Sequence, residues 1–283
     1  AYTEFQSTDI NYRRLEFSRS TDGGMTFSAP INMSGTAGYL HQGVNLAVAP
    51  NGDVVAAYTH YPTSTLTTSH VTFAKSTDGG LTWTQQFVVS NIYDIRGNLI
   101  KGGNTIRVNS FPYIAVDHSF GPRRGWIYIT YAARPATGQP PDVYLVKSTD
   151  GGTTWSSPIK VNSEPANRDQ WFPAIAVDPA DGSVNIVYYD SRNYSNNDST
   201  EVYLSRSLDG GVTFEDIKVS DQAHLPRAIA GLATGYQGDY IGITAKNGVV
   251  WPFWNENRLG FHQAYTAKVF FIQINHTKLP NTE

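Results

Sequence analysis

The sequence predicts an all-β protein built from repeated four-stranded antiparallel sheets, and three observations support this fold class. A glycine-rich octapeptide recurs four times along the 283 residues. Between its copies, an apolar segment followed by a turn also recurs. Glycine, proline and tyrosine contribute 25, 15 and 17 residues, a composition typical of many short strands joined by turns.

The octapeptide predicts the architecture. Its copies occupy residues 20–27, 76–83, 148–155 and 207–214, and each has the pattern Ser-x-Asp-Gly-Gly-x-Thr-Phe/Trp. A repeat of roughly 60 residues accommodates one four-stranded sheet with its loops, which predicts a β-propeller. An aspartate that accepts backbone N–H groups, beside glycines that permit positive φ, is a turn device. Because all four copies share this chemistry, we interpret Asp22, Asp78, Asp150 and Asp209 as structural residues.

Each predicted blade contains strands A to D in chain order, with the octapeptide as the turn between C and D. The sequence indicates strand A at 44–49, 111–117, 172–178 and 239–245, strand B at 54–58, 126–131, 184–189 and 249–254, and strand C at 70–74, 143–146 and 202–205. Strand A is almost continuously apolar, so we expect it to be innermost and buried on both faces. Residues 223–233 are the best helix candidate, but Pro226 and Gly231 argue against a helix there.

The N-terminal blade is predicted to be incomplete. Ala1-Tyr2-Thr3 and Ala57-Tyr58-Thr59 stand the same 21 residues before Asp22 and Asp78, which indicates that the sequence begins inside a strand B. We therefore expect residues 1–283 to form a single propeller domain, six-bladed when intact, whose polypeptide extends upstream of Ala1. The alternative is that residues 269–275 supply the inner strand of the first blade.

Composition excludes several classes of function. The formal net charge is −3, without the basic surplus that nucleic-acid binding through phosphates requires, so we expect no nucleic-acid partner. Hydrophobic residues make up 40% of the chain, which argues against disorder. No apolar run is long enough to span a membrane. The absence of cysteine excludes disulfides and thiolate metal sites.

Candidate site residues lie on one face of the predicted propeller. In an antiparallel blade the A–B and C–D turns share one end, and the B–C and D–A loops share the other end. The D–A loops predicted at 91–110, 163–171 and 220–238 are long and polar, and such loops are where function usually concentrates. From them and from the ends of strand B we take Arg168, Asp169, Arg192, Tyr236 and Arg258 as candidate catalytic residues, and Arg96, Arg107, Trp171, His224 and Arg227 as candidate ligand-binding residues.

The recurring arginines have two interpretations. Arg134, Arg192 and Arg258 follow strand B in successive blades, and such a cluster suits bidentate binding of a carboxylate. The alternative is a structural ion pair that joins each blade to its neighbour. For Arg168 and Asp169, the alternative to a catalytic role is an ion pair on a solvated loop. For Trp171, the alternative to stacking on a sugar is that it starts strand A.

The octapeptides resemble the Asp-box, or BNR, repeats of the sialidase (neuraminidase) superfamily, and the resemblance covers essentially the whole chain. It implies a six-bladed propeller, secretion to the extracellular space or periplasm, and an exo-glycosidase acting on terminal, sialic-acid-like sugars. Sialidases use three arginines on the substrate carboxylate, a tyrosine nucleophile activated by glutamate, and an aspartate acid/base. Here the Arg-Ile-Pro segment of the family is absent, and no segment matches its nucleophile, so Tyr236 with Glu164 or Glu256 is a candidate by location only.

Two functions follow from these observations. The first is a secreted glycoside hydrolase of the exo-sialidase type, and the second is a non-catalytic propeller that binds a glycan or a protein. We expect a glycan or glycoconjugate ligand, a monomer, and no cofactor or metal. Calcium is a less favoured alternative at residues 190–201, where oxygen-bearing side chains crowd without a fixed ligand spacing.

Overall fold

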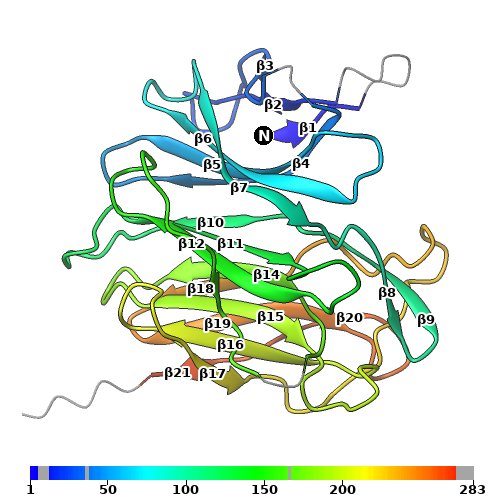
Figure 1. Ribbon diagram of the computed structural model, residues 1–283. Coiled ribbons are helices and arrows are strands. Elements are labelled where there is room, and N and C mark those ends of the chain that lie inside the picture. Colours follow the sequence, from blue (N-terminus) through cyan, green and yellow to red (C-terminus); the bar gives the residue numbers. More distant parts are fainter. Residues whose placement is uncertain (6–12, 36–37, 165–166, 272–283) are drawn as a thin grey trace, which may run out of the picture.

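The computed structural model describes residues 1–5, 13–35, 38–164 and 167–271, and it is all-β (Figure 1). None of these residues forms a helix, so this part of the chain contains no helix long and apolar enough to cross a membrane. The strands form five antiparallel sheets and one separate hairpin. The predicted all-β fold class is confirmed.

Three sheets have the predicted four strands in chain order. The second sheet contains β4 (Leu40–Val48), β5 (Val54–Tyr61), β6 (Thr68–Ser76) and β7 (Thr84–Tyr93). The third contains β10 (Tyr113–Val116), β11 (Ile127–Ala133), β12 (Asp142–Ser148) and β13 (Ile159–Lys160). The fourth contains β14 (Gln170–Val177), β15 (Val184–Asp190), β16 (Glu201–Ser207) and β17 (Glu215–Lys218). In each, the octapeptide connects the third strand to the fourth.

The first sheet has three described strands, β1 (Tyr2–Thr3), β2 (Leu15–Phe17) and β3 (Ile31–Asn32). The first octapeptide lies between β2 and β3, so β1 occupies the position of strand B, as the equal spacing of the two triplets predicts. The Thr3 hydroxyl donates to the His41 carbonyl at 3.1 Å and ties this sheet to the second.

The fifth sheet corrects one expectation. It contains β18 (Gly242–Lys246), β19 (Val249–Glu256), β20 (Gln263–Thr266) and β21 (Val269–Phe270). Both β20 and β21 pair with β19, so together they form an interrupted strand C. Residues 269–270 therefore do not supply an inner strand to the first sheet, and residues 272–275 of that predicted strand lie outside the described part.

Burial also differs from the expectation in one respect. The first strands of neighbouring sheets, β4, β10, β14 and β18, contact one another around the axis, so strand A is innermost as predicted. In the second, third and fourth sheets the most buried strand is the second one, since every residue of β11 and β15 is buried whereas β10 alternates. These strands have a neighbouring strand on each edge and a neighbouring sheet on each face, whereas β19 of the fifth sheet alternates between buried and more exposed residues.

The octapeptides fasten each sheet to the one before it. In the third copy, Asp150 accepts the Thr154 backbone N–H at 2.9 Å and the Thr154 hydroxyl at 2.6 Å, which closes the turn. The carbonyl of the first glycine accepts a cationic side chain of the preceding sheet, in the pairs Arg19–Gly79, Lys75–Gly151 and Lys147–Gly210. The second glycine lies against an apolar side chain there, so the Gly-Gly pair serves packing between sheets as well as the turn.

Part of the loop predicted at residues 91–110 is a hairpin. Strand β7 continues to Tyr93, and β8 (Gly97–Lys101) pairs with β9 (Asn104–Val108) around a turn at Gly102 and Gly103. Figure 1 shows this hairpin projecting on the side of the molecule opposite the octapeptide turns. The loop that follows β17 reaches it, because the Arg107 backbone N–H donates to the Gly235 carbonyl at 2.7 Å.

Candidate functional site

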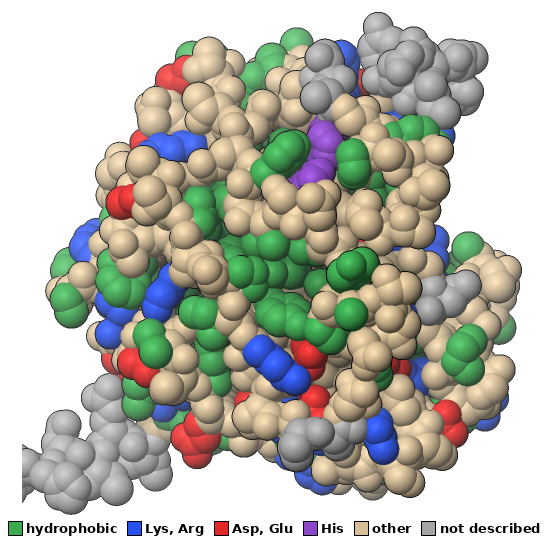
Figure 2. Space-filling model, viewed as in Figure 1, with side chains coloured by type: hydrophobic (Ala, Val, Ile, Leu, Met, Phe, Trp, Pro, Cys, Tyr) green, Lys and Arg blue, Asp and Glu red, His purple; other side chains and the backbone are tan. Residues whose placement is uncertain are grey.

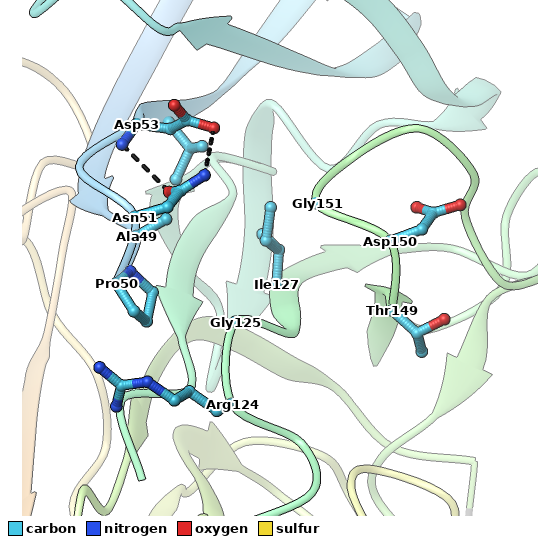
Figure 3. A pocket seen from close by; sticks show the side chains of 11 residues that line it. Ala49, Pro50, Asn51, Asp53, Arg124, Gly125, Ile127, Thr149, Asp150 and Gly151 are labelled. Carbon is cyan, nitrogen blue, oxygen red and sulfur yellow. Dashed lines mark hydrogen bonds between the residues drawn. The ribbon is translucent and has the colours of Figure 1, made fainter. Parts of the chain in front are cut away.

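Cavities lie on both faces of the molecule: the octapeptide face, which carries the A–B and C–D turns, and the opposite face, which carries the B–C and D–A loops and which we call the loop face. Among the residues that the structure describes, the cavity on the octapeptide face has no carboxylate free to act on a ligand. This cavity of about 460 Å³ is lined by residues of the turns after β4, β10 and β12, among them Asn51, Asp53, Arg124 and Asp150 (Figure 3). Asp53 accepts a hydrogen bond from Asn51 and pairs with Lys75 at 2.8 Å. Both oxygens of Asp150 are used within its turn. The carboxylates of this cavity are therefore engaged in holding the turns.

The loop face carries a larger and more polar cavity, which brings together three predicted residues. It measures about 560 Å³, and its lining includes His224 and Arg227 from the loop after β17 and Arg258 from the loop after β19. We call it the Arg227 pocket. A two-way backbone bridge to Thr200 fixes His224, with N···O distances of 2.9 and 3.0 Å.

Glu256 organises the inner wall of the Arg227 pocket. It pairs with Arg258 through one oxygen and lies 3.3 Å from His224 Nδ1 through the other. Burial would raise the pKa of Glu256, but hydrogen bonds from His224, Arg258 and Trp254 bring it below its ordinary value. Glu256 is therefore ionised at neutral pH and positions its two neighbours.

The two arginines of this pocket differ in their availability. Arg258 also pairs with Asp221, so two carboxylates share its charge. Arg227 is exposed, and the ion pairs formed among the described residues do not include it. Arg227 is therefore the guanidinium of this pocket that is most available to an acidic ligand, and Arg258 contributes as a positioned, largely neutralised donor.

Tyr236 has the neighbouring carboxylate that a nucleophilic role requires, although it belongs to Asp239 rather than to Glu164 or Glu256. Arg107 pairs with Asp239 at 3.0 Å, and its guanidinium stacks 4.7 Å from the centre of the Tyr236 ring. Partial burial and the Asp239 carboxylate raise the pKa of Tyr236. The phenol therefore stays protonated at neutral pH unless a ligand changes its surroundings.

The structure places Asp169 and Trp171 in a buried network rather than in an open site. Asp169 pairs with Lys101 at 2.6 Å, and the Lys101 side chain is 0% exposed. Trp171 is also 0% exposed, stacks on Tyr189, and lies 4.7 Å from Lys101 Nζ. The Trp171 ring has no exposed surface for a sugar here, and Trp171 is the second residue of β14 (Gln170–Val177), which fits the alternative that it starts strand A. The Asp169 carboxylate holds the hairpin's buried lysine.

Arg192 likewise has structural partners. It pairs with Asp190 and Asp216, each at 2.7 Å, and stacks on Tyr203 at 4.1 Å. Its two buried carboxylate partners leave no net positive charge for an acidic ligand. Both lie in the same sheet as Arg192, on β15 and β17, so these are ion pairs within one sheet rather than between neighbouring sheets. Nearby, Arg168 donates to the Tyr194 carbonyl at 3.0 Å.

The acidic loop at residues 190–201 uses its oxygens in hydrogen bonds. Asp190 binds Arg192, Asp198 accepts the Gly102 backbone N–H, and Glu201 pairs with Lys218 at 3.1 Å. Within the described part of the chain, no three His, Asp or Glu side chains are grouped so that they could hold a metal ion.

Sequence reasoning missed a histidine cluster in the second sheet. His41 Nε2 and His60 Nδ1 are 2.9 Å apart, and the ring of His70 lies 5.4 Å from that of His60 and stacks on Phe87. Figure 2 shows histidine side chains bordered by hydrophobic ones in the upper part of the molecule. Burial and the two neighbouring histidines lower the pKa of His60 to about 4. The sequence signal was available, since His41, His60 and His70 lie on three consecutive strands.

Comparisons with known proteins agree with this fold. No family model matches the chain. A sialidase from Micromonospora viridifaciens is 32% identical over 124 residues, which is 39% of this chain and 18% of that protein. A Hadza microbial sialidase has a TM-score of 0.56 at 17% identity over 81% of this chain and 45% of that one.

Two further solved structures are similar over most of this chain. The NanB sialidase from Streptococcus pneumoniae has a TM-score of 0.55 at 11% identity, over 84% of this chain and 51% of that one. A protein of unknown function from Dyadobacter fermentans has a TM-score of 0.55 at 17% identity, over 93% of this chain and 70% of that one. The chain spans under a fifth of the curated relative and about half of the two sialidase structures. The resemblance to the sialidase superfamily and the sialidase-like fold are thus confirmed.

Proposed function

We propose that this sialidase-like propeller is a secreted carbohydrate-active protein that takes a terminal acidic sugar, of the sialic acid type, into the Arg227 pocket. The observation that carries the proposal is the convergence of Arg227, Arg258 and His224 from two loops on one cavity of about 560 Å³. A guanidinium fork matches a planar carboxylate, and a donor already held by Glu256 loses little freedom when the ligand arrives.

In the hydrolytic form of the proposal, the Tyr236 hydroxyl oxygen attacks the anomeric carbon and its proton passes to Asp239. The glycosidic bond breaks, water protonates the leaving oxygen, and a second water then hydrolyses the tyrosine–sugar bond. Asp239 is held by Arg107 and lies beside the Tyr236 hydroxyl. Neither residue lines the Arg227 pocket, so this form of the proposal requires the bound sugar to extend from the pocket to Tyr236. A tyrosine nucleophile is the known exception to the two-carboxylate scheme of glycosidases.

A second function, glycan binding without hydrolysis, has one observation in its favour. The pKa of Tyr236 is raised, so the resting protein holds a neutral and weakly nucleophilic phenol. Under this alternative the Arg227 pocket recognises the acidic sugar, and the Tyr236 ring serves as a contact surface stacked on Arg107.

One paired assay tests both forms. Hydrolysis of aryl sialosides and neutral aryl glycosides is measured beside calorimetric binding of sialic acid, for the wild type, Arg227→Gln, Tyr236→Phe and the control Arg124→Gln. Arg124 lies on the octapeptide face, where it donates to the His118 and Ser119 carbonyls. We expect Arg227→Gln to weaken sialic acid binding about tenfold, through one charge-assisted hydrogen bond of roughly 1.5 kcal/mol.

The outcomes separate the alternatives. Turnover that is lost in Tyr236→Phe while binding is retained supports the hydrolase. Binding without turnover in the wild type supports the recognition protein. Sialic acid binding that is absent in the wild type, or equal in the wild type and Arg227→Gln, contradicts the proposed site.

A further inference from the structure

A separate cavity of about 400 Å³ lies on the loop face between the second and third sheets. Its lining includes Thr67, Thr68, Tyr93, Asp94, Arg96 and Arg134. It shares no lining residue with the Arg227 pocket. Two arginines that follow different strands, β7 and β11, therefore line one cavity.

Both arginines are held by neutral groups. The Arg134 backbone N–H donates to the Tyr93 carbonyl at 2.9 Å, which joins the two walls, and Arg134 Nη1 donates to the Gln139 carbonyl at 2.5 Å. Arg96 Nη1 donates to Gln42 Oε1 at 2.5 Å, and its guanidinium lies 5.4 Å from the centre of the Tyr61 ring. A guanidinium has five N–H donors, so each of these side-chain bonds uses one of them.

The charges in this cavity are not balanced. The ion pairs among the described residues do not include Arg96 or Arg134, whereas Arg107, Arg192 and Arg258 are all paired with acids. The only carboxyl group among the lining residues is that of Asp94. It is buried, and its two oxygens accept Ser69 Oγ and the Arg96 backbone N–H, each at 2.5 Å.

We propose that this cavity is a second binding site, for the anionic group of an acidic sugar, either the carboxylate of a uronic acid or a sulfate ester. Planar guanidinium groups bind such oxyanions through paired hydrogen bonds. The Thr67 and Thr68 hydroxyls supply partners for sugar hydroxyls, and Tyr93, which is 42% exposed, offers a ring to a sugar face. The site does not depend on the proposed function, since it needs neither Tyr236 nor the Arg227 pocket.

The test is a calorimetric titration at low ionic strength with glucuronate, glucose 6-sulfate and neutral glucose. The proteins are the wild type, Arg96→Gln, Arg134→Gln, the double variant, Arg134→Lys, and the control Arg124→Gln on the opposite face. We expect a bound anionic sugar in the wild type, about tenfold weaker binding in each single variant, and loss of this binding in the double variant. Arg134→Lys keeps the charge without the fork and is expected to bind with intermediate affinity.

The outcomes identify the ligand or overturn the proposal. Binding of glucuronate alone assigns the site to carboxylates, and binding of the sulfate alone assigns it to sulfate esters. Binding of glucose as tight as that of both anions, or anion binding unchanged in a double variant that unfolds like the wild type, overturns it. If the double variant does not fold, unchanged binding in Arg134→Lys and Arg134→Gln overturns it. The same titrations in an Arg227→Gln background exclude glucuronate bound in the Arg227 pocket, so the two proposals fail independently.

Discussion

Replacing Asp169 by alanine should destabilise the protein through Lys101. The Lys101 side chain is 0% exposed, and Nζ lies 2.6 Å from Asp169 Oδ2. Without Asp169, the buried ammonium keeps three neutral acceptors, Ser191 Oγ at 3.0 Å, the Asn197 carbonyl at 2.8 Å and Asn197 Oδ1 at 3.3 Å. Removal of one partner of a buried ion pair costs about 3–5 kcal/mol, and the three remaining acceptors place the expected loss near the lower end, at about 3 kcal/mol.

Urea denaturation followed by tryptophan fluorescence measures this loss, and Trp171 beside Lys101 reports on the site itself. Burial lowers the folded-state pKa of Lys101 below its ordinary 10.5, and loss of Asp169 lowers it further. The folded state then binds fewer protons than the unfolded state, so the penalty is complete below the folded pKa and absent above 10.5. The double variant Lys101→Met/Asp169→Leu is expected to recover most of the stability, because no charge remains buried.

One result would refute this reasoning. If Asp169→Ala unfolds within about 0.5 kcal/mol of the wild type, the range of a neutral surface substitution, yet loses sialoside hydrolysis, then Asp169 is catalytic, as predicted from the sequence.

Two further predictions concern packing and pH. Gly152→Ala should lower stability by about 1–3 kcal/mol in thermal unfolding, because a Cβ there would lie 2.5 Å from Phe73 at a φ of +92°. Gly24→Ala is the matched control, with a φ of +89° and no neighbour within 4 Å, and equal losses in the two variants would contradict the packing role. For His60, the folded-state pKa of about 4 lies below the ordinary 6.5, so its contribution to stability is complete above pH 6.5 and is lost as the pH falls to 4. His60→Asn should flatten urea-unfolding stability between those values, and an unchanged slope would count against this interpretation.

The fold was predictable because its signals repeat. Each octapeptide marks a turn between strands C and D, and the apolar segments between copies mark strands A and B, so the sheets follow from spacing alone. The hairpin of β8 and β9 was also within reach, since Gly102-Gly103 between two β-prone segments is a hairpin signal. The interruption between β20 and β21 was not, because pairing of both with β19 depends on contacts that no local pattern records.

The sequence predicted which face of the molecule carries the candidate site, but not which residues of that face are available to a ligand. The loops that hold Arg227 and Arg258 meet on the predicted face because of strand order. Arg192 pairs with Asp216, 24 residues away, and Lys101 pairs with Asp169, 68 residues away. Both ion pairs depend on how the loops and strands pack, which the local sequence does not record. A sequence shows which arginines share a face, but only the structure shows which of them carboxylates already neutralise.

The most direct test of the central claim, that function resides on the loop face, is to map amide chemical shifts by NMR as sialic acid is added to the wild-type protein. The structure predicts shifts concentrated at residues 222–227 and 257–260, which line the Arg227 pocket. Shifts concentrated instead at residues 49–53, 124–127 and 149–151, which line the cavity of the octapeptide face, would contradict the account.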